Sequence, residues 1–233
     1  MRSCFTDGYD ETYARLCITE CFRDLNLSLV RRENDPPDLE DNINNVGIEV
    51  VRSTLGDNEA LWSAFSEYQG RPIESINEKR LAKITSDSGN RRKLLPDENG
   101  NVAAALAVFE FDDEGTRLQP LHLIECVLRK KLEILNEKRY PRYERDGLFI
   151  CNSGGFCFEE ELLEWMSSII EGLKDEYKRL YDFIIIYCDH QVYLCDFERR
   201  SVREETLTDK QIERLKKESL TCLGRKEAYE ELP

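Results

Sequence analysis

The sequence contains no long apolar run. Its longest strongly apolar stretch, residues 183–188 (FIIIYC), is far shorter than the roughly 20 residues that a membrane-spanning helix needs. The first twenty residues also lack the uninterrupted apolar core of a signal peptide. We therefore expect a soluble, cytoplasmic protein without a membrane partner, whose nine cysteines are reduced thiols.

Positive charge is scarce as well. The 233 residues include 47 acidic and 33 basic side chains, which gives a formal net charge of −14. No overall basic field attracts a polyanion, so contact with nucleic acid would need a local basic groove. Runs of basic residues are also typical of solvated loops. The densest clusters are Arg91-Arg92-Lys93 and the group Arg139, Arg142 and Arg145.

Several common catalytic motifs are missing. The two histidines, His122 and His190, do not have the spacing to cysteine that zinc sites use. Residues 152–155 (NSGG) lack the GK[ST] ending of a P-loop and the glycine spacing of a dinucleotide-binding turn. Cys17 and Cys21 lie four positions apart on the apolar side of a predicted helix, which indicates core packing. Zinc, nucleotide-fold and thiol chemistry therefore have little support.

Hydrophobic periodicity predicts a mixed α/β fold. Apolar residues at spacings of three and four predict a helix over 9–27, and the Asn-rich turn 41–45 before a strand at 46–52 predicts a hairpin. We expect one domain, 1–233, with a helical and loop insertion at 56–101. Further expected elements are helices at 57–69, 73–84, 121–138 and 159–180, a loop at 85–101, strands at 148–151, 183–188 and 192–197, and either a strand or a helix at 102–111.

The strand at 46–52 carries a carboxylate, Glu49, inside its apolar run. Alternation puts Glu49 and Val51 on one face of the strand and Arg52 on the other. If that face is open to water, Glu49 is merely solvated, whereas a buried carboxylate needs a cation or hydrogen-bond donors. Asp38 precedes the turn, so the hairpin would bring two carboxylates to neighbouring strands. Such hard oxygen ligands can share a divalent ion such as Mg²⁺.

The pattern Pro37-Asp38 followed by Ile48-Glu49-Val50, after a helix, resembles the PD-(D/E)xK nuclease superfamily. The resemblance covers about residues 9–53. It implies a restriction-endonuclease-like fold, a mixed sheet flanked by helices, with Asp38 and Glu49 as ligands of Mg²⁺ or Mn²⁺. It also implies metal-dependent hydrolysis of phosphodiester bonds in DNA or RNA.

The lysine that the superfamily carries two positions after the glutamate is absent, because Val51 stands there and cannot carry a proton or offset phosphate charge. Lys131 falls inside the apolar stripe of the helix at 121–138, and Lys138 near the helix end is an alternative. Lys131 could extend along the helix into solvent, or cross to the acids. Members of the superfamily can move this lysine to a following helix, so the resemblance implies Lys131 as the third catalytic residue.

Glu11 lies near the apolar stripe of the first helix. The resembled fold often places a helical glutamate beside the metal ions, so Glu11 is a third candidate ligand, with an ordinary solvated acid as the alternative. A second function class also fits the sequence. The missing lysine and the acidic surface are typical of a catalytically inactive nuclease-fold protein that acts as an acidic protein-binding or inhibitory module.

Overall fold

The chain forms two compact units, one of residues 8–53 with 119–233 and one of residues 1–7 with 54–118. The computed structural model describes residues 8–32, 36–53, 64, 68, 70–77, 93–106, 120–152, 158–188 and 190–222. Within these ranges, no helix combines the length and the apolar character needed to cross a membrane.

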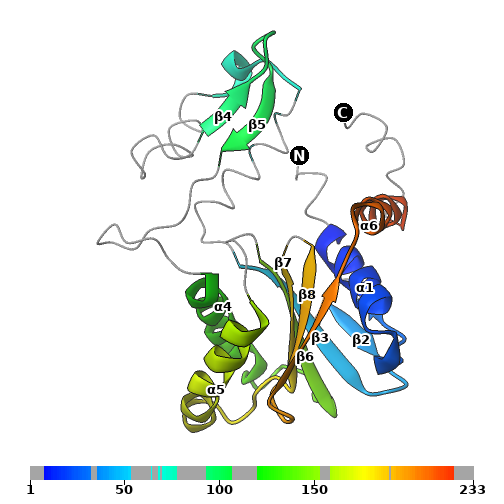
Figure 1. The fold of residues 1–233 in the computed structure, drawn as a ribbon, viewed down its shortest axis with the longest axis vertical. Helices are drawn as coiled ribbons and strands as arrows, with labels where there is room; N and C mark the ends of the chain where they lie inside the picture. Colours follow the sequence, from blue (N-terminus) through cyan, green and yellow to red (C-terminus); the bar gives the residue numbers. More distant parts are fainter. Residues whose placement is uncertain are drawn as a thin grey trace. The chain divides into compact units, whose positions relative to one another are not determined.

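A seven-stranded mixed sheet forms the centre of the larger unit (Figure 1). Its strands are β1 (Val30–Arg31), β2 (Leu39–Asp41), β3 (Val46–Arg52), β6 (Arg145–Cys151), β7 (Phe183–Cys188), β8 (Gln191–Asp196) and β9 (Ser201–Thr206). They are ordered β1-β2-β3-β6-β7-β8-β9. The central strands β3, β6 and β7 are parallel, and the outer pairs are antiparallel. The hairpin at 38–52 is confirmed as β2 and β3.

Four helices cover the two faces of this sheet: α1 (Tyr9–Cys21) and α6 (Asp209–Cys222) on one face, α4 (Pro120–Leu135) and α5 (Glu159–Glu176) on the other (Figure 1). Side-chain alternation along β6 separates two apolar cores. Leu148 and Ile150 pack in the core with α4 and α5, whereas Phe149 packs in the core with α1 and α6. The larger unit is therefore an α/β structure of three layers.

The smaller unit contains a two-stranded antiparallel sheet of β4 (Lys93–Pro96) and β5 (Val102–Leu106) and a short 3₁₀ turn, η2 (Ile73–Ser75). The strand alternative for 102–111 is therefore correct as far as Leu106, and residues 107–111 lie outside the described part. The predicted loop at 85–101 is wrong at β4. Within 73–77 the predicted helix is only the η2 turn. Of the predicted helix 57–69, the structure describes Ala64 and Tyr68, both helical.

Helices of the larger unit end earlier than their apolar periodicity predicts. Helix α1 stops at Cys21 because Phe22 leaves helical backbone geometry and Asn26 is left-handed, with φ 48°. A 3₁₀ turn, η1 (Arg23–Leu25), separates these two residues. Strand β9 and helix α6 were not predicted. The polar sequence of β9 (SVREET) reflects its position at the edge of the sheet, where it needs few apolar residues.

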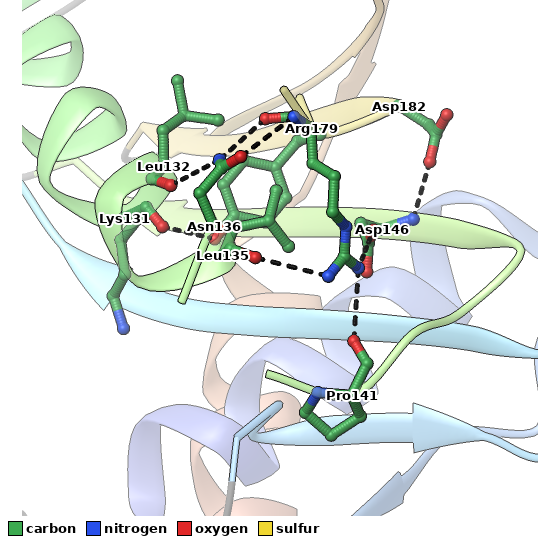
Figure 2. Close-up of polar contacts among 9 residues, drawn as sticks. Lys131, Leu132, Leu135, Asn136, Pro141, Asp146, Arg179 and Asp182 are labelled. Atoms are coloured by element: carbon green, nitrogen blue, oxygen red, sulfur yellow. Dashed lines mark hydrogen bonds and ion pairs between the residues drawn. The ribbon is translucent and has the colours of Figure 1, made fainter. Parts of the chain in front are cut away.

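Arg179, in the segment between α5 and β7, ties several parts of the larger unit together (Figure 2). Its Nη2 donates to Oδ2 of Asp146 at 2.7 Å and to the Pro141 carbonyl at 3.2 Å. Its Nη1 donates at 3.3 Å to the carbonyl of Leu135, where α4 ends and backbone carbonyls lack helical partners. Asp146 is 5% exposed, so Arg179 also neutralises a carboxylate buried at the start of β6.

We expect Arg179→Met to lower the free energy of unfolding by about 3 kcal/mol, because it leaves the Asp146 carboxylate buried without its cation. Urea unfolding measures the loss, and Asp146→Asn in the same chain should recover part of it. The matched control is Arg200→Met, which breaks the ion pair between Arg200 and Glu171. These two side chains are 56% and 64% exposed, so their pair should contribute little. An equal loss in both variants would contradict this role of Arg179.

Candidate functional site

The turn between β2 and β3 is held by the buried carboxylate of Asp41. Its Oδ1 accepts hydrogen bonds from the backbone N–H groups of Ile43 at 2.8 Å and Asn44 at 3.0 Å. Its Oδ2 accepts one from the Asn44 side-chain amide at 2.7 Å. This turn holds the register in which Leu39 pairs with Ile48, and that register decides which residues of β2 and β3 are neighbours.

Asp38 lies directly before β2, where the pairing of β2 with β3 ends. Its Oδ2 accepts a hydrogen bond from the backbone N–H of Val50 at 2.7 Å. The carboxylate thus accepts the Val50 N–H, which would otherwise need a backbone carbonyl of a longer β2 as its partner. Because Val50 directly follows Glu49, this bond places the Asp38 carboxylate beside Glu49. The two candidate ligands do not point to separate surfaces.

Glu49 faces α4 and contacts Lys131 (β3 and α4 in Figure 1). Lys131 Nζ donates to Glu49 Oε2 at 2.7 Å, and only 4% of the Glu49 side chain and 18% of the Lys131 side chain are exposed. Lys131 therefore crosses to the acids instead of extending into solvent. Arg52 makes a bidentate ion pair with Asp10 of α1, with both contacts at 2.7 Å. The prediction that Glu49 and Arg52 point to opposite faces is confirmed.

The environment of Asp38 disfavours its ionised form. Burial and then the negative charge of Glu49 raise the pKa of Asp38 to about 6, with a smaller contribution from Glu11. The hydrogen bond from Val50 and the charge of Lys131 act in the opposite direction but do not compensate fully. The carboxylates around Asp38 thus carry more negative charge than Lys131 neutralises.

Oε2 of Glu11 is buried without a hydrogen-bond partner among the described residues. Oε1 of Glu49 is also buried and makes no short hydrogen bond, although the Tyr140 hydroxyl interacts with the Glu49 carboxylate and this contact contributes to the raised pKa of Tyr140. A buried anionic oxygen without a partner is destabilising. Glu11 stands in the first turn of α1, and its charge reaches Asp38. A ligand that brings positive charge or donors to these oxygens would therefore be bound favourably.

Two tyrosines that the sequence analysis did not select border Glu49. Tyr140 and Tyr181 are 5% and 1% exposed, and burial together with the charge of Glu49 raises the pKa of both hydroxyls. The Tyr181 hydroxyl donates to the backbone carbonyl of Lys131 at 3.2 Å, which helps to hold the middle of α4. Both tyrosines lie outside regular elements, where periodicity gives no signal.

Asp38 and Glu49 are the residues that could hold a metal ion. Within the described ranges, no group of three or more histidine, cysteine, aspartate or glutamate side chains is arranged around a possible ion. Glu11 therefore stays a predicted ligand that the geometry does not join to the other two. Lys138, the alternative lysine, is exposed beyond the end of α4.

No family model, curated protein or solved structure matches this chain. Its function must therefore be inferred from the geometry and charges of Asp38, Glu49 and Lys131.

We expect Asp38→Asn to stabilise the protein at pH 8. The native pKa of Asp38, about 6, exceeds the unperturbed 3.8, so the native state binds the proton more tightly and loses stability as pH rises from 4 to 6. The amide keeps an acceptor for Val50 and removes the charge. The gain should reach up to about 3 kcal/mol above pH 6 and vanish below about pH 4 in urea unfolding.

The control for this pH series is Asp24→Asn. The ion pair with Arg203 lowers the pKa of Asp24, so the ionised carboxylate stabilises the native state above its unperturbed pKa. Asp24→Asn should therefore lower the free energy of unfolding at pH 8, whereas Asp38→Asn should raise it. A gain for Asp38→Asn that is the same at pH 4 and pH 8 would refute the charge-based explanation.

Proposed function

We propose that this chain is a metal-dependent nuclease with a restriction-endonuclease-like fold, which hydrolyses phosphodiester bonds in DNA or RNA. The 2.7 Å contact between Lys131 Nζ and Glu49 Oε2 is the observation that supports this most strongly. It supplies a cation beside Asp38 and Glu49, a role that Val51 cannot perform. Helix α4 comes after β3 in the chain, which matches the shifted position of the lysine in the resembled superfamily.

The donor set fits Mg²⁺ or Mn²⁺. Mg²⁺ is commonly held by one or two protein carboxylates, with waters and substrate phosphates as its remaining ligands. Asp38 and Glu49 meet that requirement, and Glu49 Oε1 is a buried anionic oxygen that Lys131 does not occupy. These two side chains would hold the ion. When bound, the ion would lower the pKa of a coordinated water and polarise the phosphate.

The protein groups have separate tasks in this proposal. Lys131 keeps Glu49 in place through Oε2 and does not occupy Oε1, while its ammonium group stabilises the negative charge that develops on the phosphate. Asp38 holds the ion as an anion, and because its pKa in the metal-free protein is about 6, protons should compete with the ion and weaken Mg²⁺ binding as pH falls below about 6. Tyr140 and Tyr181, both buried, limit water on the α4 side of Glu49.

The alternative function is an acidic protein-binding or inhibitory module with the same architecture. The net charge of −14 and Val51 at the usual lysine position favour it. In that case the Lys131 and Glu49 pair has a structural role, and the site binds no metal ion.

Three substitutions test the nuclease proposal: Asp38→Asn, Glu49→Gln and Lys131→Met. We expect each to lower Mg²⁺-dependent cleavage of plasmid DNA, or of single-stranded DNA or RNA, by at least about 100-fold, because each removes charge at the reacting phosphate. Matched controls are Lys130→Met, the exposed neighbour of Lys131 on α4, and Glu20→Gln on α1. Both should cleave like the unaltered protein.

Calorimetry separates metal ligands from the lysine. Glu49→Gln should lose the heat of Mg²⁺ binding, whereas Lys131→Met should keep it because both acids remain. An unaltered protein that neither binds Mg²⁺ nor Mn²⁺ nor cleaves any of these substrates would contradict the proposal and favour the acidic binding module.

A further inference from the structure

The segment between α4 and β6, residues 136–144, alternates between anchored and exposed side chains. Asn136, Pro141 and Tyr143 are half-buried and Tyr140 is buried, whereas the basic side chains between them are exposed. We call this segment the α4–β6 loop. Such a pattern indicates a loop with a defined conformation that presents its charged residues to solvent.

Arg179 anchors the first half of the α4–β6 loop (Figure 2). The Asn136 amide donates to the Arg179 carbonyl at 3.0 Å, and the Arg179 N–H donates back to Asn136 Oδ1 at 3.0 Å. The Arg179 guanidinium also donates to the Pro141 carbonyl and lies over the Tyr140 ring, 5.5 Å from its centroid. Backbone and side-chain contacts therefore both fix this half.

Tyr143 anchors the second half beside β3. Its hydroxyl donates to Glu40 Oε2 at 3.0 Å and accepts a hydrogen bond from Arg32 at 3.2 Å. Its ring lies so close to Gly47 that a Cβ added there would be 2.6 Å from the ring. Gly47 is two positions before Glu49, and the charge of Glu49 also reaches Tyr140. Both anchoring tyrosines thus place the loop next to the candidate site.

The exposed basic residues of the loop are Lys138, Arg139 and Arg142, and none of them forms an ion pair with another described residue. These guanidinium groups are therefore available to an external anion, although the chain has 47 acidic residues. Several other arginines of the larger unit have carboxylate partners, among them Arg52, Arg129, Arg179, Arg200 and Arg203. Arg15 and Arg145, like the two loop arginines, form no ion pair with another described residue.

We propose that the α4–β6 loop binds the phosphate backbone of the nucleic acid, with Arg139 and Arg142 as the contacting residues, and so delivers a phosphodiester to Asp38 and Glu49. This inference rests on the proposed nuclease function. Guanidinium groups suit phosphate oxygens because they donate in a planar fork. The three basic side chains of the loop outnumber its two exposed acids, Glu137 and Glu144, so the loop reduces the repulsion that a chain of charge −14 exerts on a polyanion.

The test compares Arg139→Gln/Arg142→Gln with the unaltered chain. Binding of fluorescently labelled duplex DNA and single-stranded RNA is measured by anisotropy over a salt series, with Ca²⁺ in place of Mg²⁺. We expect the Kd of the preferred nucleic acid to rise about tenfold near 100 mM salt. The slope of log Kd against log salt should fall by about 2, one for each lost phosphate contact.

The matched control is Lys210→Gln/Lys216→Gln, which removes the same charge from exposed positions of α6 on the opposite face of the sheet. It should leave both Kd and slope nearly unchanged. Thermal unfolding of both double variants should match that of the unaltered chain, because the substituted side chains are exposed.

The outcomes distinguish this inference from the nuclease proposal. If Arg139→Gln/Arg142→Gln loses binding and Glu49→Gln retains it, the loop binds nucleic acid whether or not cleavage occurs. If cleavage depends on Asp38 and Glu49 while the loop variant keeps its Kd, salt slope and KM, the inference is wrong and the nuclease proposal stands. The inference is also wrong if the unaltered chain binds no nucleic acid, or if both double variants weaken binding equally.

Discussion

The ion pair between Lys131 and Glu49 is the interaction on which the candidate site depends. It joins the middle of α4 to the middle of β3 across 2.7 Å, with both side chains largely removed from water. Each buried charge would cost several kcal/mol alone, so neither residue can be removed without leaving the other uncompensated. The pair uses one oxygen of Glu49, and the other is buried beside the Tyr140 hydroxyl without a short hydrogen bond.

The site nevertheless holds more negative than positive charge. Asp38 is bonded to the backbone beside Glu49, and its pKa is raised to about 6 by burial and then by the charge of Glu49, which Lys131 does not fully offset. This excess of negative charge does not stabilise the folded chain by itself. A divalent cation, alone or together with a bound phosphodiester, would neutralise it. Tyr181 and Arg179 hold α4 by its backbone carbonyls, which keeps Lys131 on a rigid element.

Sequence patterns identified the hairpin from its Asn-rich turn, and alternation placed Glu49 and Arg52 on opposite faces of the strand. The period of 3.6 residues placed Lys131 on the apolar stripe of its helix but left open whether it crosses to the acids, which only the family resemblance implied. These patterns did not identify Tyr140 or Arg179. Both lie in connecting segments, whose conformation depends on tertiary contacts and leaves no periodic pattern in the sequence. Strand β9 was missed because an edge strand lacks apolar alternation. Strand β4 was missed because turn-forming residues surround it in the sequence.

Anomalous diffraction from crystals grown with Mn²⁺ tests the central claim most directly. The account predicts a manganese peak in contact with carboxylate oxygens of both Asp38 and Glu49, absent in crystals of Glu49→Gln. Crystals without such a peak, in which Lys131 and Glu49 remain paired and Asp38 binds only the Val50 N–H, would contradict it. The charge cluster would then be a structural feature of the fold and not a metal centre.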